Sequence, residues 1–162
     1  MHDQLDQRRR CAQGHGQARR DLRTRGDDRV LAQGGDDLIR GGPGHDRIFG
    51  GPGDDTIKGQ GGRDLIQGRQ GEDRIRGGAL RDRIEGERGD DVIRGGNGRD
   101  RLVGNQHDGL SRAGPDNDRL RGNVGDDTLD ARDGSGGDTA EGMEGSDTCP
   151  ADPGDAVTSC EA

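Results

Sequence analysis

The sequence predicts an all-β solenoid, in which two sheets of short parallel strands enclose a thin aliphatic core. Three observations lead to this fold class. A nine-residue unit repeats twelve times without a break from Arg23 to Asp130. Its sixth place holds Asp and its eighth place an aliphatic residue in eleven of the twelve units, and its first and fourth places each hold Gly in nine. A period this short is typical of chains in which each unit buries its inner face only by stacking on its neighbours.

Composition alone points in another direction. Only 23% of the 162 residues are hydrophobic, 36% are charged and 34 are Gly, which is typical of disorder. A disordered chain has no reason to keep a strict register over twelve units, so the order of the residues outweighs their average. The net charge of −8 disfavours nucleic acid as the main partner and suits cations. No apolar run is long enough to span a membrane.

Within each unit, places seven to nine predict a three-residue strand with the eighth side chain pointing inward. Places one to six predict a turn, where Gly supplies the positive φ that other residues resist. Two strands and two turns then make one coil of two units, and neighbouring coils lie about 4.8 Å apart. Cations at the outward places are expected in solvent, among them Arg29, Arg47, Lys58, Arg74 and Arg101.

Stacked coils bring the sixth-place aspartates into two columns, one on each edge. The first column is expected to contain Asp28, Asp46, Asp64, Asp82, Asp100 and Asp118, and the second Asp37, Asp55, Asp73, Asp91 and Asp127. Like charges at this spacing repel, and one aliphatic side chain per unit offers little burial to oppose the repulsion. Cations between successive carboxylates would relieve it. Carboxylates and turn carbonyls favour Ca²⁺ over Mg²⁺ or Zn²⁺, and metal binding would then be coupled to folding.

The units "GGPGHDRIF", "GGPGDDTIK" and "GGNGRDRLV" resemble the RTX (haemolysin-type) calcium-binding nonapeptide repeat at every fixed place. The resemblance covers residues 23–130 well and 133–150 loosely. It implies a parallel β-roll with Ca²⁺ between stacked turns, and secretion from bacteria. The metal-binding residues expected on this basis are the aspartates of both columns together with Asp138 and Asp147, and the turn glycines Gly41, Gly42, Gly44, Gly50, Gly51, Gly53, Gly95, Gly96 and Gly98. Adjacent Asp pairs in the regular array allow at most about eight ions.

Several units depart from the pattern. Leu80 replaces the fourth-place Gly, which puts the sites shared by Asp82 in doubt, and Asp116 at the same place in another unit could add a ligand. Gly109 removes one carboxylate, so a gap is expected in the second column, and Ser111 stands where an inward aliphatic residue is expected. After Asp130 the register slips by two residues and then resumes.

The two ends of the chain differ in character. Residues 1–22 are expected to be a disordered flank, 23–150 the repeat domain and 151–162 a C-terminal cap. Cys149 and Cys160 lie close together at the end of the array and could form a disulfide that closes the open end, with two free thiols as the alternative. A disulfide would require an oxidising compartment. Cys11 is left over, either free or intermolecular.

The N-terminal segment has no apolar stretch of the secretory type, so export would need another route or the start is misassigned. Its arginines could contact nucleic acid or lie in a solvated flank; they are Arg8, Arg9, Arg10, Arg19 and Arg20. The histidines lack zinc-ligand spacing and are expected in solvent; they are His2, His15, His45 and His107.

The pattern contains no catalytic constellation, because no Ser has a neighbouring His and no phosphate loop occurs. The chain is therefore expected not to be an enzyme but a secreted calcium-binding module with a scaffold or adhesion role, whose protein partner the sequence does not indicate. An alternative is the C-terminal export and folding tail of a larger secreted enzyme, such as a protease or lipase, or of a toxin. An ice- or surface-binding solenoid is disfavoured, because the seventh place lacks a regular row of Thr.

Overall fold

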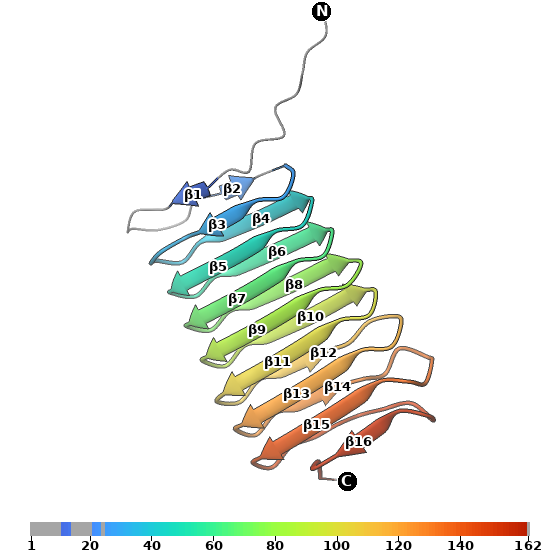
Figure 1. Ribbon diagram of the computed structural model, residues 1–162. Coiled ribbons are helices and arrows are strands. Elements are labelled where there is room, and N and C mark those ends of the chain that lie inside the picture. The colour runs from blue at the N-terminus through green and yellow to red at the C-terminus, as the bar shows by residue number, and fades with distance from the viewer. Residues whose placement is uncertain (1–10, 14–20, 24, 162) are drawn as a thin grey trace, which may run out of the picture.

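The computed structural model describes residues 11–13, 21–23 and 25–161, with side-chain surroundings from residue 25 onward. In these ranges every regular element is a strand, and all strands pair in parallel in two sheets (Figure 1). Up to residue 144 the chain winds alternately through one sheet and the other, so that successive coils stack into a rod (Figure 1). The predicted fold, an all-β parallel solenoid of the β-roll type, is confirmed.

We call the nine-stranded sheet A and the seven-stranded sheet B. The strands of sheet A, in spatial order, are β1 (Cys11–Gln13), β3 (Arg29–Leu31), β5 (Arg47–Pro52), β7 (Leu65–Gln70), β9 (Arg83–Arg88), β11 (Arg101–Gln106), β13 (Arg119–Val124), β15 (Thr139–Glu144) and β16 (Ala156–Thr158). The strands of sheet B are β14 (Thr128–Asp130), β12 (Leu110–Arg112), β10 (Val92–Asn97), β8 (Arg74–Ala79), β6 (Thr56–Gly61), β4 (Leu38–Pro43) and β2 (Asp21–Arg23).

The register of the sheets follows the repeat. Ile48 of β5 pairs with Ile66 of β7, and Ile57 of β6 pairs with Ile75 of β8, so each residue pairs with its equivalent two units further along the chain. One coil therefore contains two nine-residue units, as predicted. Because the offset is constant through the regular array, equivalent places of every second unit lie side by side along the rod.

Most strands are longer than predicted. They run over six residues rather than three, because the backbone pairing between strands continues through the glycine-rich first to third places. There Gly51 pairs with Arg69 and Gly42 with Gln60. The turn is confined to places four to six. Positive φ occurs at the second and fourth places, for example 99° at Gly42 and 135° at Gly44, but not at the first. The prediction that every turn Gly serves φ is therefore wrong for the first place.

The core is one aliphatic side chain thick on each sheet. The eighth-place residues are 0–2% exposed; they are Val30, Ile39, Ile48, Ile57, Ile66, Ile75, Ile84, Ile93, Leu102, Leu120 and Leu129. Ser111 keeps the inward position in the irregular unit, at 2% exposure. The outward cations named from the sequence, such as Arg47 and Lys58, are exposed as predicted.

The C-terminal end preserves the stack after an insertion. Leu120 pairs with Ala140, two places beyond the regular offset, so the predicted two-residue slip is confirmed. The extra residues lie between β14 and β15, where Ala131 is buried. Cys149 packs against the core and lies near Cys160, with their Cα atoms 5.8 Å apart.

At the N-terminal end, β1 and β2 extend the two sheets into the segment predicted to be a flank. His2, His15, the arginines of residues 8–10 and 19–20, and the side chain of Cys11 lie outside the described residues. The described part of the chain has no helix of the length and apolar character needed to cross a bilayer.

The fold predicts that alanine substitution destabilises the protein at one of two neighbouring glycines and is tolerated at the other. Gly62 has φ 135°, and a methyl group there would overlap the carbonyl group of Gly44, whereas a methyl group at Gly61 would meet nothing within 4 Å. We expect Gly62→Ala to lower the free energy of unfolding by about 1–3 kcal/mol or more, the range for backbone strain. Gly61→Ala is the matched control and should leave stability nearly unchanged. Urea unfolding in saturating calcium measures the stability of both variants, and equal losses would contradict this expectation.

Candidate metal centre

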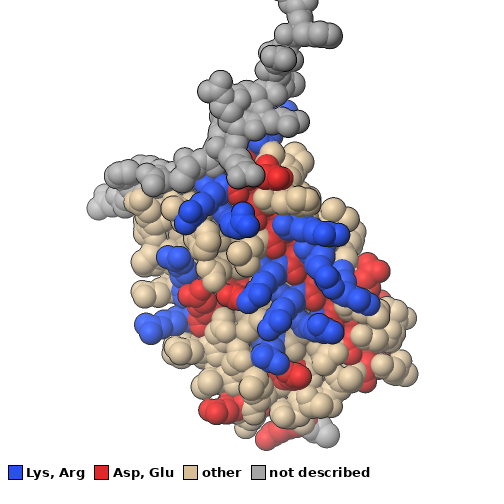
Figure 2. Space-filling model, in the orientation of Figure 1, with Lys and Arg blue, Asp and Glu red and all other residues tan. Residues whose placement is uncertain are grey.

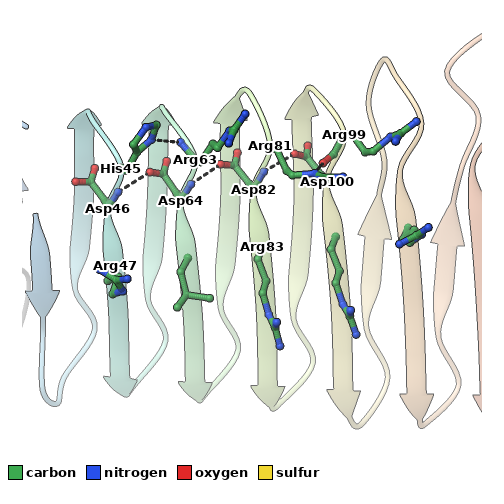
Figure 3. Close-up of a pocket in the computed structure, with 13 residues that line it drawn as sticks. His45, Asp46, Arg47, Arg63, Asp64, Arg81, Asp82, Arg83, Arg99 and Asp100 are labelled. Carbon is green, nitrogen blue, oxygen red and sulfur yellow. Dashed lines mark hydrogen bonds between the residues drawn. The ribbon is translucent and has the colours of Figure 1, made fainter. Parts of the chain in front are cut away.

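The sixth-place aspartates form two ladders along opposite edges of the rod. In each ladder the backbone N–H of one Asp donates to Oδ1 of the Asp in the next coil, at 2.6–2.9 Å (Figure 3). The first ladder joins Asp28, Asp46, Asp64, Asp82, Asp100, Asp118 and Asp138. The second joins Asp37, Asp55, Asp73 and Asp91, and then Gly109, Asp127 and Asp147. The two columns predicted from the sequence are therefore assembled by the fold, and Asp138 and Asp147 extend them.

The second carboxylate oxygen is left without a protein partner in most of these residues. It is buried and makes no hydrogen bond in Asp46, Asp55, Asp64, Asp73, Asp82, Asp91, Asp100, Asp127, Asp138 and Asp147. A buried acceptor without a partner costs free energy, and such groups are rare in folded proteins. The same oxygen recurs at the same position in coil after coil, which indicates a ligand that the polypeptide itself does not supply.

The first-place glycines explain where such a ligand fits. A methyl group on Gly41 would overlap Oδ2 of Asp46 and lie 2.8 Å from the carbonyl oxygen of Gly59. The same pair of oxygens, a carboxylate from the unit and a carbonyl from the next coil, surrounds the equivalent point at Gly50, Gly59, Gly68 and Gly122. The first place therefore needs Gly for space rather than for φ. Carboxylate and carbonyl oxygen atoms, which are hard ligands, border that space.

The unit of Asp118 provides an internal contrast. Ala113 occupies its first place, where the regular units have Gly. Oδ2 of Asp118 accepts a hydrogen bond from the N–H of Gly114 at 3.0 Å, so this oxygen is satisfied within the protein. In the regular units the glycine and the orphaned oxygen thus occur together, and the sequence analysis missed this link. The recurrent first-place Gly was visible in the sequence, but only the structure shows that its φ is ordinary.

The donor set fits Ca²⁺, which takes carboxylate and carbonyl oxygens in flexible geometry. Among the described residues, no three His, Cys, Asp or Glu side chains converge on one point. A site on either ladder would therefore have to be completed by backbone carbonyls. His45 and His107 are exposed, as predicted, and lie outside this oxygen set.

Burial perturbs the titration of the ladder carboxyls. Desolvation raises the pKa of Asp73 to about 8, and the neighbouring Asp91 and Asp55 add to the effect. Burial likewise raises the pKa of Asp82, Asp100 and Asp118 to about 7.

Asp130, which lies outside the ladders, shows the opposite case. Its hydrogen bond from Arg132 lowers its pKa, and Arg112 pairs with it at 3.0 Å. This carboxylate is neutralised by cations of the chain itself. The ladder carboxylates need a cation from elsewhere to reach the same state.

The two edges differ in charge at the fifth place, next to each ladder. On the edge of the first ladder this place holds His45, Arg63, Arg81 and Arg99 in the central coils, between Asp27 and Asn117, and we call it the basic edge (Figure 3). On the edge of the second ladder it holds Asp36, Asp54, Glu72, Asp90, Asp108 and Asp126, and we call it the acidic edge. Burial raises the pKa of both Asp55 and Asp64; the charges of Asp36 and Asp54 add to the rise at Asp55, whereas His45 opposes it at Asp64. The acidic edge therefore offers a cation the more favourable potential.

The residues that depart from the repeat pattern change the structure only in their own surroundings. Leu80 adopts φ 76° and is exposed, and the ladder bond from Asp82 to Asp100 is kept, so the backbone around Asp82 retains the regular shape. Asp116 is exposed. Gly109 keeps its N–H bond to Asp127 but has no carboxylate to offer Asp91, so the carboxylate row is interrupted where the sequence predicted a gap.

The sequence pattern of the RTX calcium-binding nonapeptide repeat, in four copies, matches residues 24–57, 49–82 and 76–106, which together exceed half of the chain. No curated protein matches the chain. No solved structure matches it either. Repeats of this kind bind Ca²⁺, in agreement with the oxygen donors that line both edges. The chain belongs to the RTX calcium-binding nonapeptide repeat family.

Proposed function

We propose that Ca²⁺ ions bind along the two ladders, between successive coils, and that this binding drives folding. The observation that carries the proposal is the row of buried carboxylate oxygens without partners, which in the regular units lie beside a first-place Gly and a carbonyl of the next coil. When bound, the ions would neutralise the carboxylates and coordinate the oxygen atoms that lack a protein partner. The ladder aspartates, including Asp138 and Asp147, would supply the carboxylates, and first-place glycines such as Gly59 and Gly68 would supply carbonyls.

The number of ions follows from the same residues. Successive Asp pairs in the regular array give at most about eight sites. Gly109 removes one carboxylate from the second ladder, and Ala113 occupies the space that Gly provides elsewhere. We therefore expect fewer ions than Asp pairs, with the acidic edge filled first.

The biological role that fits these properties is a secreted, calcium-stabilised scaffold or adhesion module. RTX repeats are typical of secreted bacterial proteins, and calcium is abundant outside cells. A rod whose buried charges require calcium would stay unfolded where calcium is scarce and fold where it is plentiful. The β-roll itself is a structural calcium-binding module rather than a catalytic one.

Calcium dependence of folding is the first test. We expect a disordered circular dichroism spectrum in chelator and a β spectrum in millimolar Ca²⁺, because the orphaned carboxylates oppose folding until a cation neutralises them. Equal β content in both conditions would refute ion-coupled folding.

The ladder assignment is tested by a pair of neighbouring substitutions. Asp73→Asn removes a charge shared by the coils on either side, and we expect the calcium midpoint to rise by about tenfold, which corresponds to about 1.4 kcal/mol, with lower cooperativity. Arg74→Ala changes an exposed residue of β8 and serves as the control. If both variants shift the midpoint equally, the ladder assignment fails.

Protons should compete with calcium. The pKa of Asp73 is about 8 in the folded chain against an ordinary value of 3.8, so the calcium-free fold binds protons more tightly than the unfolded chain does. Its stability should therefore rise as pH falls from about 9 to about 5, and fall as pH rises through the folded pKa values. Calcium binding near neutral pH should release protons, which calorimetry in buffers of different ionisation enthalpy measures. Calcium binding near neutral pH without proton release would contradict the prediction.

We also propose a disulfide between Cys149 and Cys160, whose Cα separation of 5.8 Å is within the disulfide range. It would close a short loop beside the last coil and stabilise the fold by about 3 kcal/mol. A Cys149→Ser and Cys160→Ser double variant should unfold at correspondingly lower urea in saturating calcium. Thiol titration of the unfolded wild type then decides the matter, because three reactive thiols without reductant would exclude the bond.

A further inference from the structure

The acidic and basic edges carry opposite charges at equal spacing along the same rod. Arg63, Arg81 and Arg99 follow one another on the basic edge, one per coil, and all three are exposed. Asp54, Glu72 and Asp90 do the same on the acidic edge, and are also exposed. Because both rows come from the fifth place of the same two-unit coil, their spacing is set by one strand separation of about 4.8 Å.

The basic edge is hollowed. A groove of about 460 Å³ runs along it between the fifth-place arginines and the seventh-place arginines Arg47, Arg83 and Arg101 (Figure 3). Its floor is formed by the first ladder, including Asp64. Figure 2 shows Lys and Arg side chains gathered on one face, with carboxylates running between them, although the chain as a whole has a net charge of −8.

Backbone N–H groups hold several carboxylates of the acidic edge in one orientation. Oδ1 of Asp54 accepts the N–H of Glu72 at 2.8 Å, and Oδ1 of Asp36 accepts the N–H of Asp54 at 3.0 Å. The same bond joins Asp108 to the N–H of Asp126, at 2.9 Å. One oxygen of Asp36, Asp54 and Asp108 is thus held by the backbone while the side chain remains exposed, so these three carboxylates lose little side-chain freedom on binding.

Calcium loading favours contact between such edges. Four bound ions would cancel the net charge of −8, since each carries two positive charges, and near-neutral proteins associate more readily. Ions on the first ladder would also neutralise the floor of the groove. This step rests on the proposed function.

We propose that the acidic edge of one molecule docks in the arginine groove of a second copy of the chain. Single surface ion pairs contribute little, but three or more in register act together. The two surfaces are different patches of the same chain, so the contact is heterologous and leaves a free edge on each side. The product is an open lateral array of rods rather than a closed dimer.

Sedimentation of the calcium-loaded chain tests the proposal. We expect the average mass to grow continuously with concentration in about 0.01 M NaCl, where the Debye length is about 30 Å, and to return to the monomer in about 1 M NaCl, where it is about 3 Å. R63E/R81E/R99E reverses three charges of the basic edge, and D54R/E72R/D90R reverses three charges of the acidic edge. Each variant alone should remain monomeric, and an equal mixture of the two should regain association.

The control is K58E/R76E/R94E, which reverses three exposed cations, also one per coil, on sheet B. It should associate like the wild type. Circular dichroism in calcium, recorded for every variant, separates loss of the fold from loss of docking, and R63Q/R81Q/R99Q provides a milder form of the basic-edge change. A folded wild type that stays monomeric, a plateau at dimer, or a mixture that fails to associate would overturn the proposal. Binding of poly-L-glutamate to a monomeric wild type, lost in R63E/R81E/R99E, would assign the groove to a foreign polyanion instead.

Discussion

The structure depends on how each ladder aspartate divides its two oxygens. One oxygen is fixed by the backbone N–H of the neighbouring coil, and this fixes the direction of the other. In the regular coils the second oxygen therefore points to the same kind of place, beside a first-place Gly and a carbonyl of the next coil. A row of buried acceptors without donors is unfavourable in a polypeptide alone. The need for a cation is thus built into the same bonds that hold the coils in register.

The thin core makes this dependence severe. Each regular unit buries one aliphatic side chain, such as Ile66, and the remaining interior is backbone and carboxylate. Asp130 illustrates another solution to the same problem, since Arg112 and Arg132 neutralise it from within the chain. That pairing lies at the ninth place and in the insertion, away from the turns that hold the ladder carboxylates. An external ion performs the same neutralisation with no additional residue.

The repeat fixes the backbone but leaves the fifth place free. The ladders on both edges have the same hydrogen-bond geometry, yet one lies beside Arg63 and Arg81 and the other beside Asp54 and Glu72. Because the fifth place is exposed and makes no contribution to the core, its charge can be chosen separately for alternate units. The same scaffold therefore presents two surfaces of opposite sign at equal spacing.

The sequence by itself determined the coil length, the inward eighth place and the membership of the two columns, because a constant period dictates which residues become neighbours once coils stack. It also located the interruption at Gly109 and the slip after Asp130. It did not determine the length of the strands or the role of the first-place Gly, and it did not indicate which carboxylate oxygen is bound and which is free. Those features depend on close contacts between atoms of neighbouring coils, and only the tertiary structure sets them.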